Sequence, residues 1–153
     1  MAKESAGLLM YRRRRATLEV LLVHPGGPFW ARKDSGAWSI PKGEAALAES
    51  LLARAEQEFL EETGFRADGP FHPLPAVRQA GGKTVHAFAV AGDCDANAIK
   101  SNLFTVEWPP RSGRQQEFPE VDRAAWFDLA TARQKINKGQ IPLLDALERL
   151  LRS

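Results

Sequence analysis

A run without proline or glycine, residues 49–63, most constrains the folds open to this chain. Leu52, Ala55 and Phe59 recur along it at helical spacing and define one apolar stripe, and Gly64 follows as a helix stop signal. Strand-like runs lie before and after this helix in the sequence. The pattern therefore predicts a mixed α/β domain whose sheet is covered on both faces.

The other expected elements are short strands, loops and a final helix. Alternating or continuous apolar runs, bounded by glycine and proline, predict strands at 5–11, 18–24, 37–41, 73–79, 83–90, 102–108 and 123–129. A turn is expected at 41–43, a hairpin turn at 80–82 and a proline-rich polar loop at 109–122. Asp128 can cap a short helix from Ala130, and a last helix is expected over 141–151.

Composition points to a globular protein of 153 residues, with a formal net charge of +2. We expect one domain, residues 1–153, which is large enough to bury a core without disulfides. Cys94 is the only cysteine, which is compatible with a cytoplasmic location. No signal peptide or membrane-spanning stretch is expected. The run Arg12–Arg15 is expected to be a solvated hairpin end, since no nucleic-acid motif accompanies it.

Glu58, Glu61 and Glu62 project from one side of the expected helix, because their offsets are 0, 3 and 4. Like charges at this spacing repel, and the helix dipole disfavours anions near the C-terminal end. No lysine or arginine lies between Ala55 and Thr63 to offset them. One interpretation is a solvated acidic face. The other is a site for a divalent cation, which would remove both penalties and accept hard oxygen ligands.

Residues 43–65 resemble the Nudix box, G-x5-E-x7-R-E-U-x-E-E-x-G-U, in which U is bulky and aliphatic or aromatic. The matching positions are Gly43, Glu49, Glu58, Phe59, Glu61, Glu62, Gly64 and Phe65. The departure is Gln57, where the family has arginine. Segments 38–43 and 121–129 also resemble the family, so the resemblance covers about 5–129. It implies a Nudix-type α/β/α sandwich with a mixed central sheet.

The resemblance also implies a Mg²⁺- or Mn²⁺-dependent pyrophosphohydrolase that acts on a nucleoside diphosphate linked to another group X. The implied catalytic residues are Glu58, Glu61, Glu62 and Glu120. The implied metal ligands are Glu58 and Glu62, with Glu61 and the Gly43 carbonyl as further ligands and Glu49 as a support. Glu120 is the expected general base and Glu117 its competitor.

The choice of X is less constrained, although the chain most resembles the branch that hydrolyses diadenosine polyphosphates. The candidates for binding phosphate are Lys42, Arg12, Arg32, Lys83 and His86, and those for stacking on a base are Phe29 and Trp30. His24, His72 and His86 show no metal-ligand spacing. ADP-ribose and damaged nucleoside triphosphates stay open as substrates.

A catalytically weak nucleotide-binding module is the alternative. Gln57 cannot supply the charge with which the family arginine orients the acidic residues. Residues 46–48 also stand where many relatives have a Glu-Pro-Gly run. No nucleic-acid or membrane partner is expected, and the chain is expected to be a monomer or a homodimer.

Overall fold

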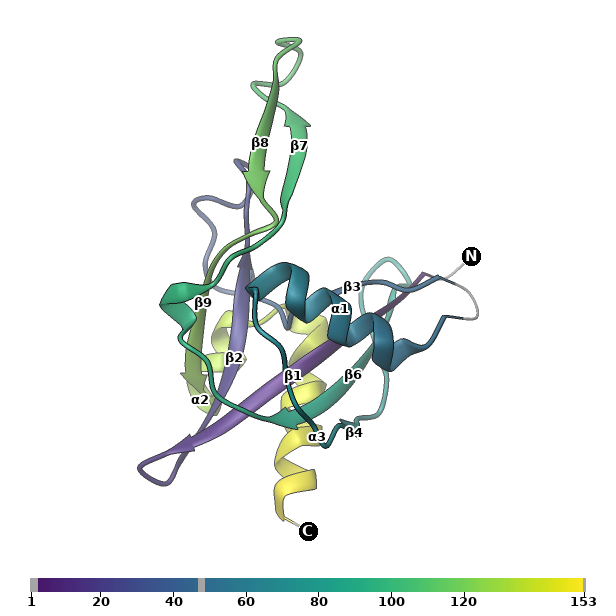
Figure 1. Cartoon of the computed structure of the whole chain (residues 1–153), viewed down its shortest axis with the longest axis vertical. Coiled ribbons are helices and arrows are strands. Elements are labelled where there is room, and N and C mark those ends of the chain that lie inside the picture. The colour runs from purple at the N-terminus through teal and green to yellow at the C-terminus, as the bar shows by residue number, and fades with distance from the viewer. Residues whose placement is uncertain (1–2, 47–48, 153) are drawn as a thin grey trace.

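The structure is a computed structural model that describes residues 3–46 and 49–152 (Figure 1). Its strands are β1 (Glu4–Arg14), β2 (Thr17–Pro25), β3 (Lys42–Glu44), β4 (His72–Pro73), β5 (Val77–Arg78), β6 (Thr84–Ala91), β7 (Leu103–Glu107), β8 (Gln115–Pro119) and β9 (Val121–Asp128). Its helices are α1 (Leu51–Thr63), α2 (Leu129–Lys135) and α3 (Ile141–Arg152), with short 3₁₀ turns at Ala96–Ala98 and Lys138–Gln140. Leu47 and Ala48, in the loop before α1, lie outside the described residues.

The central sheet is mixed and has the order β4-β6-β1-β2-β9, with β3 paired to β1 and β5 paired to β6. β1 and β6 are parallel, and the other pairs in this sheet are antiparallel. Helix α1 covers one face, and α2 and α3 cover the other (Figure 1). The predicted α/β/α sandwich with a mixed sheet is therefore confirmed.

Two apolar cores hold the layers together. On the α1 side, Ala55 and Phe59 are buried against Leu8 and Met10 of β1. On the other side, the last helix buries Leu143, Leu144 and Leu147 against β1, β2 and β6. Alternate residues of β1 serve the two cores, as expected for a strand whose successive side chains point to opposite faces. Because β1 is central, both helical layers depend on it.

The expected helices are confirmed, and Gly64 and Asp128 lie at their ends as expected. Ser50 accepts a hydrogen bond from Ala53 N at the start of α1, and Gly64 ends the helix with a φ of 81°. Asp128 accepts a hydrogen bond from Thr131 N and begins α2. Helix α1 begins two residues later than predicted, since Ser50 is the capping residue.

Three predictions about strands were wrong. The strand expected at 73–79 is two separate short strands, β4 and β5, with residues 74–76 between them. Residues 37–41 make only isolated bridges through Trp38 and Ser39, and the strand begins instead at 42–44, where a turn was expected. Pro41 has no N–H to donate to a strand ladder, whereas the three residues after it pair with the first part of β1. The predicted polar loop 109–122 contains β8, which pairs with β7 in a separate two-stranded sheet. This strand is polar because it packs on no core face, so it lacks the alternation that marks a half-buried strand.

The β7–β8 hairpin projects beyond the body of the molecule (Figure 1). Its base is tied down, because Glu120 N donates to Asn102 O across the two chain segments that leave the body. The β1–β2 hairpin lies at the opposite end and turns at Arg15 and Ala16, both with positive φ. Among the described residues, no helix is long and apolar enough to cross a membrane.

Candidate functional site

Strand β3 brings the backbone of Gly43 directly against Glu58 of α1. Gly43 pairs with Ala6 of β1, and α1 packs across these two strands. A methyl group on Gly43 would overlap the Glu58 carboxylate. Any side chain at this position would therefore push the Glu58 carboxylate away from β3.

Glu62 lies one turn further along α1 and is 8% exposed. Burial, together with the nearby charge of Glu58, raises the pKa of Glu62 to about 9, although Lys42 opposes the shift. Burial also lowers the pKa of Lys42, and the neighbouring Lys83 adds to that effect. Glu62 is thus a buried carboxyl group beside half-buried Lys42, and its raised pKa favours the neutral form at neutral pH.

Glu61 and Glu120 lie at the base of the projecting hairpin. Asn102 N donates to Glu61 O, and Asn102 Nδ2 lies 3.3 Å from Glu61 Oε1. Partial burial of its carboxylate, and the charges of Glu58 and Glu61, raise the pKa of Glu120. Residues from α1 and from the bend between β8 and β9 therefore share one electrostatic site. Glu117, the predicted competitor of Glu120, lies on β8 of the hairpin, opposite Thr105.

The carboxylates form a donor set that fits a hard divalent cation. They bring negative charge together at one place, where the charge of Glu58 adds to the effect of burial in raising the pKa of Glu62. Among the residues that the structure describes, no group of three or more His, Cys, Asp and Glu side chains could hold a metal ion by itself. Mg²⁺ commonly keeps several waters and shares coordination with substrate phosphates, so it does not need a closed protein cage.

Glu62, Lys42 and Glu120 line a pocket of about 330 Å³, which we call the Glu62 pocket. Trp30 and Trp38 supply aromatic surface to it. Its polar lining includes the amide side chains of Gln79, Asn137 and Gln140. The pocket thus joins the acidic site to aromatic and amide surface, a combination that is typical of small-molecule sites.

Gln140 holds one wall of the Glu62 pocket together. It is fully buried, accepts a hydrogen bond from Ile40 N, and donates to Ser39 Oγ and Gln79 Oε1. Because its carbonyl and amide groups are both engaged, Gln140 fixes the position of Gln79. No sequence pattern marked these amides, since they come from segments far apart in the chain.

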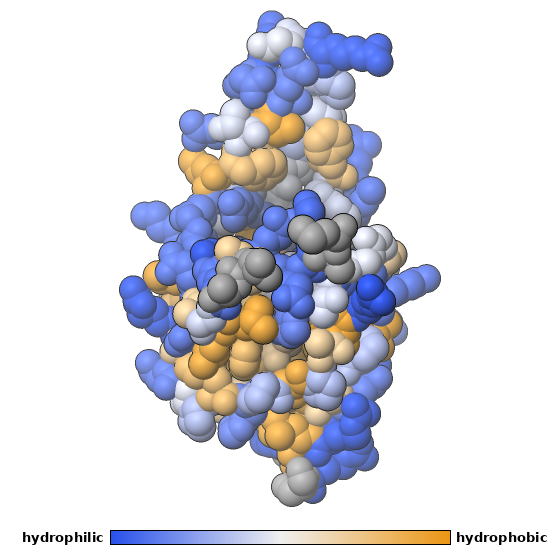
Figure 2. Space-filling view, turned by 90° about the vertical axis from the view of Figure 1, so that its right-hand side faces the viewer, coloured by the Kyte–Doolittle hydropathy of each residue, from blue (hydrophilic) through white to orange (hydrophobic). Residues whose placement is uncertain are grey.

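An aromatic rim, formed by Phe29, Trp30 and Trp108, lies beside the pocket. Phe29 and Trp108 meet edge to face at 5.2 Å, and Phe29 is 56% exposed. On the face of the molecule that Figure 2 shows, a separate apolar band lies below the hydrophilic tip of the projecting hairpin. The loop that carries Phe29 and Trp30 is anchored by buried His24, whose ring nitrogens lie 2.9 Å from Asp122 Oδ1 and 2.6 Å from Lys33 O.

Four of the five predicted phosphate-binding residues lie outside this pocket. His86 is in register with Ala6 and lies 3.2 Å from Glu4. Lys83 is close enough to affect Lys42, whereas Arg32 is exposed in the loop after β2. Arg12 lies five residues beyond Gly7, the partner of Lys42 on β1, which is about 16 Å along the strand.

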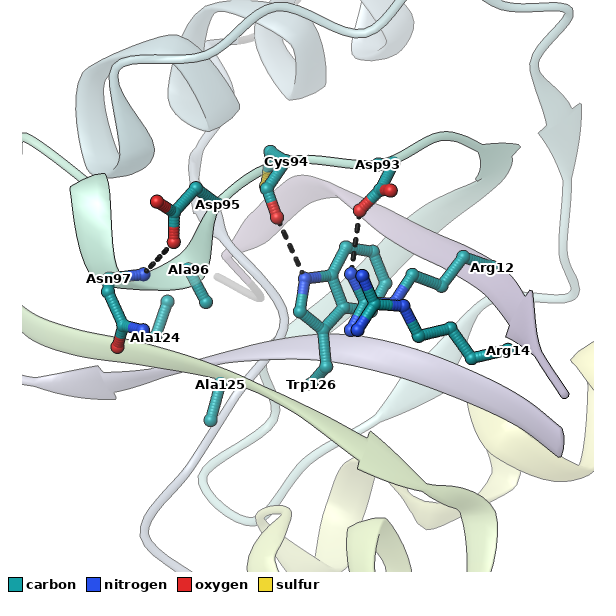
Figure 3. Close-up of a pocket in the computed structure, with 10 residues that line it drawn as sticks. All are labelled: Arg12, Arg14, Asp93, Cys94, Asp95, Ala96, Asn97, Ala124, Ala125 and Trp126. Carbon is teal, nitrogen blue, oxygen red and sulfur yellow. Dashed lines mark hydrogen bonds and ion pairs between the residues drawn. The ribbon is translucent and has the colours of Figure 1, made fainter.

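Arg12 is instead part of a second cavity, of about 610 Å³, at the far end of the sheet. It donates to Glu19 and Asp93, and its guanidinium lies 4.0 Å from the centre of the Trp126 ring (Figure 3). The structure therefore separates Arg12 from the glutamates of helix α1. Burial raises the pKa of Cys94 in the same cavity, which agrees with an unreactive thiol.

Arg54 is a site residue that the sequence analysis did not identify. It contacts Glu49 at 2.8 Å and Glu58 at 3.0 Å, while Gln57, at the position of the family arginine, is exposed. The i, i+4 spacing of Arg54 and Glu58 was the available signal.

Comparison with protein families agrees with the resemblance in the box. The model of the NUDIX domain matches residues 1–147.

Similar solved structures show the same fold. The NUDIX domain of Shewanella oneidensis NrtR, complexed with ADP ribose, has a TM-score of 0.69 at 18% identity and covers 99% of this chain and 89% of its own. An Ap4A hydrolase from C. elegans has a TM-score of 0.68 at 20% identity, covering 99% and 98%. A mutT/nudix family protein from Listeria innocua has a TM-score of 0.64 at 17% identity, covering 98% and 94%.

Proposed function

Because the chain belongs to the Nudix family and is an enzyme of its pyrophosphohydrolase class, we propose that it hydrolyses a dinucleoside polyphosphate. The bond cleaved would be a pyrophosphate bond in a nucleoside diphosphate linked to X. The observation that carries this proposal is that Glu62, Glu120 and Lys42 line one pocket with aromatic walls, and that the charge of Glu58 acts on Glu62 from beside it. We take the single domain, in the cytoplasm and as a monomer or homodimer, to be the functional unit.

Nudix hydrolases generally use divalent metals such as Mg²⁺ or Mn²⁺. In this chain Glu58 and Glu62 would hold the ion, with Glu61 and the Gly43 carbonyl as further ligands. The ion would neutralise the phosphate chain and polarise its oxygens.

The remaining chemistry falls to groups around these ligands. Lys42 would meet a phosphate oxygen as a point charge, and Lys83 would add positive charge beside it. Glu120 would take a proton from the attacking water, because its raised pKa lies nearer to neutral pH than that of an ordinary carboxylate. Asn102 would hold Glu61 in place.

The aromatic rim supports a substrate with two bases. One nucleoside would enter the Glu62 pocket, and the second base would stack on Phe29 and Trp108, which already stand against each other. Stacking on an aromatic side chain contributes about 1–3 kcal/mol per base. The similar C. elegans structure, an Ap4A hydrolase, agrees with this choice.

ADP-ribose is the second candidate substrate. The S. oneidensis NrtR domain, solved with ADP ribose, has nearly the same TM-score as the C. elegans enzyme. A substrate of this kind would need only the Glu62 pocket and would leave the aromatic rim free.

The test is incubation of the pure protein with dinucleoside polyphosphates, ADP-ribose and nucleoside triphosphates, with Mg²⁺ or Mn²⁺, followed by chromatography of the products. We expect the fastest cleavage with a dinucleoside polyphosphate and none in the Glu62→Gln variant. Faster cleavage of ADP-ribose would select the second candidate. Nucleotide binding without turnover would instead identify a binding module.

A further inference from the structure

We infer that Arg54 is the positioning residue of the acidic site and takes the part that the missing arginine at position 57 would otherwise play. This inference rests on the proposed function, because it concerns how the chain holds Glu58 ready for a cation. It assigns a role to a side chain outside the defined positions of the box.

The first observation is the pattern of contacts around Arg54. Its Nε and Nη2 atoms lie 2.9 and 2.8 Å from Glu49 Oε2, and its Nη1 atom donates to Glu58 Oε2 at 3.0 Å. One guanidinium thus joins the loop before α1 to the acidic face of the helix. Charge-assisted hydrogen bonds of this kind are stronger and more directional than neutral ones.

The second observation is that each end of this bridge is fixed. Glu49 Oε1 accepts a hydrogen bond from Ala46 N, so the carboxylate cannot turn away from Arg54. Hydrogen bonds from Arg54 and then from Ala46 lower the pKa of Glu49, which keeps it ionised. At the other end the Glu58 side chain is 14% exposed and lies against Gly43.

The third observation concerns which carboxylate oxygen stays available. Arg54 engages Oε2 of Glu58, while Oε1 is the atom nearest to Gly43. Arg54 therefore selects a single orientation in which one oxygen is neutralised and the other is directed at β3. Gln57 is exposed and directly precedes Glu58, and side chains at successive helix positions do not face each other, so Gln57 does not face the Glu58 carboxylate.

The chain thus has the orienting charge that Gln57 lacks, supplied from one turn earlier. This arrangement weakens the argument for a catalytically weak module, because that argument depended on a missing charge. It also predicts that an arginine restored at position 57 adds little.

The experiment compares Arg54→Gln, Arg54→Lys, Gln57→Arg and the control Arg66→Gln, which removes the same charge from an exposed arginine. Mn²⁺ affinity is measured without nucleotide, from the electron paramagnetic resonance signal of free Mn²⁺. The values of kcat and KM are measured with a dinucleoside polyphosphate. Thermal unfolding without metal identifies any variant that fails to fold.

We expect Arg54→Gln to weaken Mn²⁺ binding or lower kcat by about 10- to 100-fold, as for other residues that orient metal ligands, with little change in KM. Arg54→Lys should recover part of the loss, and Gln57→Arg and Arg66→Gln should match the wild type. If Arg54→Gln unfolds, the inference stands or falls on Arg54→Lys, which must still show a lower kcat or weaker Mn²⁺ binding.

Wild-type affinity and kcat in Arg54→Gln, or an equal loss in Arg66→Gln, would overturn the inference while leaving the proposed function intact. A wild-type protein that binds no Mn²⁺ and cleaves no nucleotide would overturn the proposed function itself.

Discussion

The burial of Glu62 predicts that a substitution which cannot ionise at this position stabilises the metal-free protein. Replacing Glu62 with Gln keeps the shape of the neutral carboxyl group and removes only the capacity to ionise. In the folded chain the pKa is raised to about 9, so folding at neutral pH requires the uptake of a proton. This proton uptake lowers the free energy of unfolding. The loss is absent below the usual pKa of 4.5 and grows as the pH rises toward about 9.

The magnitude follows from the interval between the usual pKa and the working pH. At pH 7 this interval is 7 minus 4.5, or about 2.5 units, and each unit corresponds to about 1.4 kcal/mol. Glu62→Gln should therefore raise the free energy of unfolding by up to about 3 kcal/mol at pH 7, and by less than about 1 kcal/mol at pH 5.

Urea unfolding at several pH values, in a chelating buffer, measures this difference. The control is Glu56→Gln, an exposed glutamate on the same helix, for which we expect a change within about 0.5 kcal/mol. Added Mg²⁺ should reduce the difference in free energy of unfolding between Glu62→Gln and the wild type, because it binds the folded wild type and stabilises it by mass action. If the two proteins have the same free energy of unfolding at pH 7, or differ equally at pH 5 and pH 7, the buried neutral state of Glu62 is refuted.

Three further predictions concern the reaction. Gly43→Ala should lower kcat by about 10- to 100-fold, because the new methyl group displaces Glu58, and unaltered kinetics would contradict the close contact. The double variant Gly43→Ala, Glu58→Asp should regain some of the thermal stability that Gly43→Ala loses. Glu120→Gln should lower kcat by about 100-fold or more and remove a pH–rate limb above pH 4.5, whereas Glu117→Gln should not; loss in both would argue against Glu120 as the base. Phe29→Ala should raise KM for a dinucleoside polyphosphate by about fivefold or more but leave KM for ADP-ribose unchanged, and an equal rise for both would exclude a second-base site on the rim.

The α1 segment was the most predictable part of the chain. Its length, caps and apolar stripe are local properties, and the spacing of Glu58, Glu61 and Glu62 sets their common face without reference to other elements. The hairpin at Gly81 and Gly82 was predictable for the same reason, since both residues have the positive φ that favours glycine.

The parts that could not be predicted depend on contacts across the fold. Strand β8 is polar and exposed, so only its pairing with β7 identifies it. The ion pair of Arg54 with Glu58 has a visible i, i+4 spacing, but its contact with Glu49 depends on the path of the loop before α1. The wall around Gln140 joins segments about 60 and 100 residues apart, and no local pattern records that meeting.

The position of Gln140 has a consequence for the order in which the protein becomes competent during synthesis. Domains generally fold as units during synthesis, and pairings between distant segments form late. The parallel partner of β1 is 80 positions further on, and the amide that secures Ile40 comes later still, just before α3. A nascent chain that has released the whole glutamate helix therefore still lacks Gln140, and this wall of the Glu62 pocket is complete only once nearly the entire polypeptide has emerged.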